Sequence, residues 1–254
     1  MRRRQYALSD DNVFCLALAK EIVAAKIFNS RFSLERAIRD NKENISVTSL
    51  EYASGLLNGS LKNTYDFEST DELRGFEGGC AKQYFNVFND MILQQKEHFV
   101  FAARSKRPPL DNVNCMLSYL YTILSMDIAA ALDTVGLDPS VGFYHSLRAG
   151  RYSLALDLIE ELRSYMVDRL VISMINLKKI NRADFIEKEG GAILTTDEGR
   201  KKILTAWQER KKEIILHPYL KDKIEVGLLP YAQAQLLARY VRGDATEYPP
   251  FLCK

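Results

Sequence analysis

Apolar residues recur every three or four positions along most of the chain, a spacing that is typical of amphipathic helices. The first run is predicted to begin at Ser9, a residue type that favours the N-cap, and to end before Asn41. The same spacing predicts further helices over residues 49–63, 77–93, 111–135, 152–178, 197–216 and 228–241. A short capped turn is expected over residues 69–75.

Strand signals are sparse beside these helical ones. The pair Gly190-Gly191, followed by β-forming residues as far as Thr196, predicts a single hairpin, and residues 248–251 are expected to be extended. No internal repeat, low-complexity tract or linker rich in proline and serine divides the chain. The pattern therefore predicts an all-α fold, one multi-helix domain over residues 1–254 with one minor hairpin.

Composition narrows the class of protein. The 254 residues are 47% apolar and 27% charged, enough for one large domain with a sizeable core. The formal net charge of +2 argues against a uniformly basic nucleic-acid coat, so any anion site must be local. The four cysteines are far apart and form no CxxC pair, which favours buried, reduced thiols in a cytoplasmic protein: Cys15, Cys80, Cys115 and Cys253.

No membrane segment is expected. The chain begins Met-Arg-Arg-Arg-Gln-Tyr and lacks the apolar stretch of a signal peptide. Its most apolar run, residues 116–132, contains Asp127 and is shorter than the roughly 20 apolar residues that a bilayer requires. We therefore predict that this run is a buried core helix.

The chain lacks several familiar catalytic signatures, among them the P-loop, the GxSxG elbow and the HExxH zinc motif. It has only three histidines, so a metal site would have to be mostly carboxylate. His98 and His217 lie in polar segments and are expected at the surface. His145 differs, because it connects two long predicted core helices.

Further along the chain from His145, three charged residues are spaced three positions apart: Asp157, Glu160 and Arg163. At this spacing they share one helix face, which lies beside an apolar stripe. Such a row is usually a solvated ion-pair ladder, each pair worth about 0.2–0.5 kcal/mol, and spacing alone favours that interpretation. A carboxylate at a half-buried edge otherwise needs a cation, either an arginine or a metal. Glu77 precedes Gly78-Gly79, which suggests either a close backbone approach or a helix start.

Four segments carry distinctive motifs in a fixed order. They are Glu-Gly-x-x-Ala-x-x-Tyr-Phe within residues 74–85, Arg-Pro-Pro-x-Asp-x-Val-Asn in 107–114, Gly-Phe-x-His with Leu-Asp-Leu-x-Glu-x-x-Arg in 142–163, and the ending 243–252. Together they resemble the CRISPR-associated adaptation integrase family, type I members in particular. That family captures foreign DNA fragments and inserts them as spacers into the CRISPR array.

The resemblance implies a metal-dependent DNA endonuclease/integrase with a ligand triad of Glu77, His145 and Glu160. Asp157 is implied as an additional acid, or as a residue that bonds His145 without itself ligating the metal. Two carboxylates and one imidazole suit Mg²⁺ or Mn²⁺ better than zinc, although His145 is alternatively a proton shuttle. The cations expected to hold DNA phosphates are next to the motifs: Arg74, Lys82, Arg107, Arg148 and Arg163.

Family members also begin with an N-terminal β-rich domain, which this sequence is expected to lack. The resemblance implies double-stranded or branched DNA as substrate, a homodimer in the full-length family, and the small second CRISPR adaptation protein as partner. One alternative is a truncated, catalytically silent DNA-binding scaffold. A second is a helical protein-interaction domain whose acids are ion-pair partners.

Overall fold

The structure, a computed structural model, describes residues 1–41 and 47–253. Its α-helices are α1 Arg2–Ser9, α2 Asn12–Asp40, α3 Val47–Asn63, α4 Thr70–Asn86, α5 Asn112–Thr134, α6 Ser153–Arg163, α7 Arg169–Asn176, α8 Asp197–Lys211 and α9 Leu229–Arg242. Its strands are β1 Phe185–Glu187, β2 Ile193–Thr195, β3 Ile214–Leu216 and β4 Lys223–Glu225. A π-helical turn, Ser164–Asp168, joins α6 to α7.

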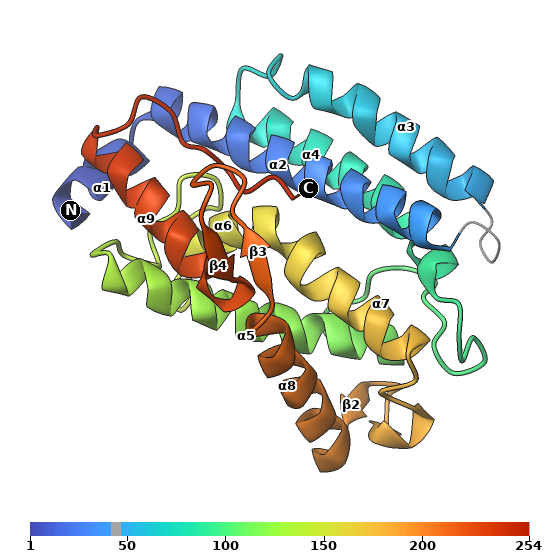
Figure 1. Ribbon diagram of the computed structural model, residues 1–254. Coiled ribbons are helices and arrows are strands. Elements are labelled where there is room, and N and C mark those ends of the chain that lie inside the picture. The colour runs from blue at the N-terminus through green and yellow to red at the C-terminus, as the bar shows by residue number, and fades with distance from the viewer. Residues whose placement is uncertain (42–46, 254) are drawn as a thin grey trace.

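The long helix α2 organises the fold. Asp11 caps its N-terminus by accepting the backbone N–H groups of Val13 and Phe14. The helix packs against α3 and α4 on one side and against α6 on the other (Figure 1). Leu18 and Ile22 lie on its buried stripe and are fully inaccessible to solvent. Helix α2 is therefore in contact with both α4 and α6.

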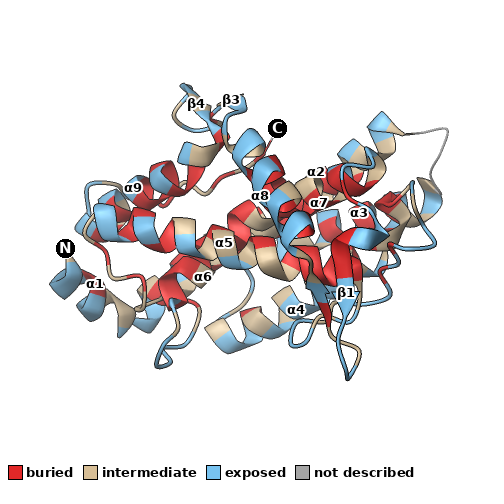
Figure 2. Cartoon of the chain, turned by 90° about the horizontal axis from the view of Figure 1, so that it is seen from below, coloured by how far each residue is buried: buried red, intermediate tan, exposed pale blue. Residues whose placement is uncertain are grey.

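Helix α5 forms the opposite wall of the core, where it contacts α6 and α9. Figure 2 shows buried, intermediate and exposed residues alternating along it. The prediction of a buried core helix is confirmed, and its bounds lie within one residue of the expected 111–135 at each end. Within the described residues it is the one helix long and apolar enough to cross a membrane, and half of its most apolar window is buried inside the fold.

Several predicted helices are confirmed with small shifts at their ends. Asp111 caps α5 through the backbone N–H of Asn114, and Pro230 lies in the first turn of α9. The predicted helix 152–178 is a continuous run of α6, the π-helical turn and α7. The four cysteines are free and buried, as expected.

The predicted start at Ser9 is wrong, because a separate helix α1 ends there. Helix α1 contains three arginines and has no apolar stripe, so hydrophobic spacing gave no sign of it. It is held instead by Gln5, whose amide group donates to the backbone carbonyl groups of Asp138 and Val141. This contact is made by the backbone of a distant loop, which no local pattern encodes.

The predicted break between a turn at 69–75 and a helix from Glu77 is also wrong. A single helix, α4, runs from Thr70 with Ser69 as its N-cap, so Glu77 lies in the middle of the helix. The three glycines of α4 do not interrupt it, since they keep helical geometry. A Cβ atom at Gly78 or Gly79 would meet nothing within 4 Å, so these glycines do not serve a close backbone approach.

The all-α prediction holds for most of the chain, but the described residues contain two antiparallel hairpins rather than one. β1 pairs with β2 as predicted, and β3 pairs with β4 where the helix 197–216 was expected to continue. The β-forming run Ile214–Leu216 explains this early end of α8. The second hairpin buries His217 completely against Gln233, so the surface prediction is wrong for His217, whereas His98 is exposed.

Candidate active site

Two of the predicted ligands meet at a lysine that the sequence analysis did not single out. Lys26 of α2 forms ion pairs with Glu77 of α4 and with Glu160 of α6, the latter at 2.5 Å between Nζ and Oε2. The three side chains are only 12%, 15% and 5% exposed. Because so little water reaches these charges, their attraction is stronger than that of a surface pair.

His145 completes the cluster from the loop before α6. Its Nδ1 atom lies 2.8 Å from Oδ1 of Asp157, and its Nε2 atom lies 3.9 Å from Oε1 of Glu160. A carboxylate at Nδ1 favours the tautomer whose proton is on Nδ1. In that tautomer Nε2 is the ring nitrogen that could ligate a metal ion.

Asp157 is fully buried and shapes the loop that carries His145. Its carboxylate accepts the backbone N–H groups of Phe143, Tyr144 and His145 at 2.7, 3.1 and 2.7 Å. The loop approaches this carboxylate so closely that a Cβ atom at Gly142 would lie 2.8 Å from Oδ2. Glycine is thus required there, and both oxygens of Asp157 are engaged in holding the histidine and its loop.

Glu160 stays ionised in this environment. Burial disfavours its charged form, but Arg163, Lys26 and His145 outweigh that cost and lower the pKa of Glu160 to about 2. Arg163 donates to Oε1 at 2.9 Å and stacks on the ring of Tyr121 at 4.8 Å. An ionised carboxylate is the form that ligates a metal ion.

The five cations predicted to hold DNA fall into two groups. Arg163 is committed to Glu160, and Arg74 donates to the backbone carbonyl of Tyr144, tying α4 to the histidine loop. The other three are exposed and have no ion-pair partner within residues 1–41 and 47–253: Lys82, Arg107 and Arg148. These three side chains are therefore accessible to a polyanion such as DNA.

The side chains fit a divalent ion by their chemistry, although they are not gathered for one. Among the described residues, no group of three or more His, Cys, Asp or Glu side chains is close enough to hold a metal ion. The ammonium group of Lys26 lies between the two carboxylates instead. Two carboxylates and an imidazole are suitable donors for Mg²⁺ or Mn²⁺, and the site already stabilises a cation.

Comparison with known proteins identifies the family. Residues 1–209 match the family described as CRISPR associated protein Cas1. The chain belongs to the Cas1 family. It is 46% identical over 252 residues to CRISPR-associated endonuclease Cas1 1 of Chlorobaculum tepidum, covering 99% of this chain and 74% of that protein. It is 44% identical to a Cas1 endonuclease of Leptospira interrogans, and the alignment covers both chains completely.

Solved structures show the same Cas1 fold. A casposase bound to integration product superposes with a TM-score of 0.84 at 26% identity, covering 97% of this chain and 66% of the casposase chain. A Cas6-RT-Cas1–Cas2 complex gives 0.83 at 26% identity, covering 99% of this chain and 26% of the other. A Cas1 protein from Thermotoga maritima gives 0.78 at 21% identity, covering 97% and 71%.

These matches confirm the predicted family and enzyme class, a CRISPR-associated endonuclease that acts in adaptation. They do not favour the silent scaffold. The roles of the individual site residues remain predictions.

Lys26 belongs to this cluster of side chains, and the motifs missed it although the sequence carried a signal for it. It lies four residues after Ile22 and three after Val23, both fully buried, so the helical period places it on the core stripe of α2. Lysine is rarely buried without an acidic partner. A lysine on an apolar stripe therefore predicts a nearby carboxylate.

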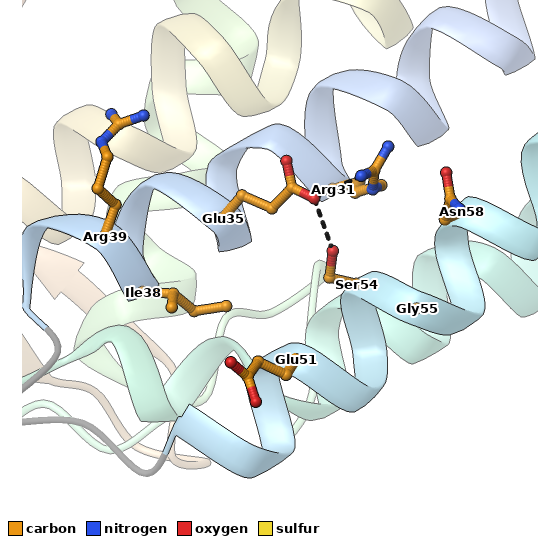
Figure 3. Close-up of a pocket in the computed structure, with 8 residues that line it drawn as sticks. All are labelled: Arg31, Glu35, Ile38, Arg39, Glu51, Ser54, Gly55 and Asn58. Carbon is orange, nitrogen blue, oxygen red and sulfur yellow. Dashed lines mark hydrogen bonds and ion pairs between the residues drawn. The ribbon is translucent and has the colours of Figure 1, made fainter.

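A separate hollow lies between α2 and α3 and has a volume of about 430 Å³ (Figure 3). Two of its charged side chains pair with each other, Arg31 with Glu35 at 2.6 Å, and Ser54 donates to Glu35 at 3.2 Å. None of the predicted site residues lines it. We therefore assign it no part in the Cas1 site.

Proposed function

We propose that this chain is a metal-dependent DNA endonuclease/integrase that inserts foreign DNA fragments into the CRISPR array, by transesterification or cleavage of phosphodiester bonds. One observation carries the proposal. Carboxylates from α4 and α6 both form ion pairs with Lys26, and an imidazole oriented by Asp157 lies 3.9 Å from the carboxylate of α6.

Each side chain of the site has a defined task in this proposal. Glu77, Glu160 and Nε2 of His145 would hold Mg²⁺ or Mn²⁺, which when bound would polarise a phosphoryl oxygen. Asp157 keeps the imidazole oriented, and Arg163 keeps Glu160 in place and ionised. These two residues act on the donors and not on the substrate.

In this proposal the exposed cations bind the DNA substrate. Lys82, Arg107 and Arg148 would contact the phosphates of double-stranded or branched DNA, which positions the duplex without reading its sequence. The structural similarity to a casposase bound to integration product supports integration as the reaction. The similarity to a Cas1–Cas2 complex supports the small second adaptation protein as partner, with a homodimer as the proposed assembly.

Removal of the metal tests this function. The purified chain is incubated with nicked, branched and intact duplex DNA, first with Mn²⁺ or Mg²⁺ and then with EDTA. We expect strand cleavage or strand joining only with the ion, and recovery of the products when excess ion is added back. DNA binding that weakens steeply with salt, without products under any of these ions, supports the silent scaffold instead and overturns the proposal.

A further inference from the structure

The position of Lys26 points to a role beyond packing. We propose that Lys26 is a built-in counter-ion of the metal site. Its ammonium group holds Glu77 and Glu160 together before the divalent ion arrives, competes with that ion for the same carboxylates, and is displaced when it binds. This inference rests on the proposed function, since it concerns the same site.

Charge balance explains why a cation is needed there. Glu77 and Glu160 bring two negative charges into a region with little access to water. Arg163 is on one oxygen of Glu160, Oε1, and Lys26 is on the other, Oε2. Within the described residues, Glu77 has no ion-pair partner other than Lys26. Without Lys26 or a metal ion, one buried negative charge would be uncompensated.

The same contacts make Lys26 a competitor of the ion. A divalent ion binds carboxylate oxygens at about 2.0–2.6 Å, and in this site the oxygens of Glu77 and Glu160 already face the ammonium group. Both cations cannot lie between the two carboxylates at once. Lysine is a point charge on a flexible four-carbon stem, so it can withdraw without movement of α2.

Competition has a measurable consequence. If Lys26 must leave when the ion binds, the cost of breaking its two ion pairs weakens metal binding. A lysine that only supports the fold stays in place when the ion binds, so its presence would leave metal affinity unchanged or raise it. Removal of the Lys26 charge should therefore raise metal affinity if Lys26 is a displaced counter-ion, and should leave it unchanged or lower it if Lys26 only supports the fold.

The test is a titration of Mn²⁺ into DNA-free protein, followed by the electron paramagnetic resonance signal of free Mn²⁺. Lys26→Met is expected to bind Mn²⁺ at least about tenfold more tightly than the wild type, and Lys26→Arg no more tightly. The matched control is Lys20→Met on the same helix, because Lys20 donates to the backbone carbonyl of Tyr65 at 2.8 Å and not to an acid. That variant should bind like the wild type.

A second measurement uses the wild type alone, in case Lys26→Met does not fold. The acylation rate of each lysine is measured by mass spectrometry with and without Mn²⁺. Release of the ammonium group should make Lys26 more reactive when Mn²⁺ is present, while the reactivity of Lys20 stays constant.

Two outcomes contradict the inference in different ways. If the wild type binds Mn²⁺ but a folded Lys26→Met variant binds it equally or more weakly, or if Mn²⁺ leaves the reactivity of Lys26 unchanged, the counter-ion role is overturned and the proposed function stands. If neither the wild type nor any variant binds Mn²⁺, the proposed function fails together with the inference.

Discussion

Replacement of Glu160 by glutamine is expected to lower metal-dependent DNA cleavage by at least about a hundredfold while leaving the fold intact. Loss of a side chain that only orients a ligand costs about 10–100-fold, and loss of a ligand should cost at least as much. Glutamine keeps the shape of Glu160, and its amide oxygen can still accept from Arg163. Its amide is neutral, however, and a neutral oxygen is a weaker ligand for a divalent ion than a carboxylate.

Single-turnover cleavage of a branched duplex with Mn²⁺ measures this loss, and thermal melting checks the fold. The control is Glu209→Gln, since Glu209 is 62% exposed and, among residues 1–41 and 47–253, forms an ion pair only with Lys179, at 3.4 Å on the surface. The control should cleave like the wild type. If a folded Glu160→Gln variant retained half of the wild-type rate, Glu160 would not be a ligand.

Removal of the carboxylate of Glu161, the residue after Glu160, should instead cause a large loss of stability. Glu161 faces away from the site and accepts hydrogen bonds from the hydroxyl of Tyr248, the backbone N–H of Phe251 at 2.6 Å and the amide of Gln233. Burial raises its pKa to about 7 despite these donors. Glu161→Ala leaves the hydroxyl of Tyr248 and the backbone N–H of Phe251 without their acceptor, while Gln233 keeps its bonds to Tyr248 and Pro249. The two unpaired donors should cost about 3 kcal/mol of unfolding free energy.

Differential scanning calorimetry should show this cost as a melting temperature lowered by about 6–12 °C. Hydrogen exchange should be faster at the backbone amides of Phe251 and Cys253, because the extended tail is anchored through Glu161 and Asn29. Glu209→Ala is the surface control, expected to melt within about 2 °C of the wild type. Equal melting of Glu161→Ala and the wild type would show that the tail does not depend on Glu161.

Glu160 and Glu161 show which properties of the site could be predicted from the sequence and which could not. Helical spacing predicted α6, and the motif resemblance selected Glu160 over Glu161. Neither could show that Glu161 is fully buried under the C-terminal tail, since that contact joins segments far apart in the chain. A helix rotates by about 100° per residue, so two neighbours with the same side chain can face entirely different surroundings.

Local patterns succeeded where the cause of the structure is local. Asp111 and Pro230 mark the starts of α5 and α9 because capping and ring geometry act within one turn. They failed for α1, which depends on contacts between Gln5 and the backbone of a distant loop. For Lys26 the helical spacing predicts a nearby carboxylate but not which one, because its partners come from two other helices.

The central claim is that Glu77, His145 and Glu160 form one divalent-metal site, and Mn²⁺ binding tests it most directly. Electron paramagnetic resonance counts the ions bound per chain, without DNA, in the wild type and in Glu77→Ala, His145→Ala and Glu160→Gln. We predict one tightly held ion per chain in the wild type and binding weakened at least about tenfold in each variant. Wild-type binding in all three variants, or no bound ion in the wild type, would contradict the claim.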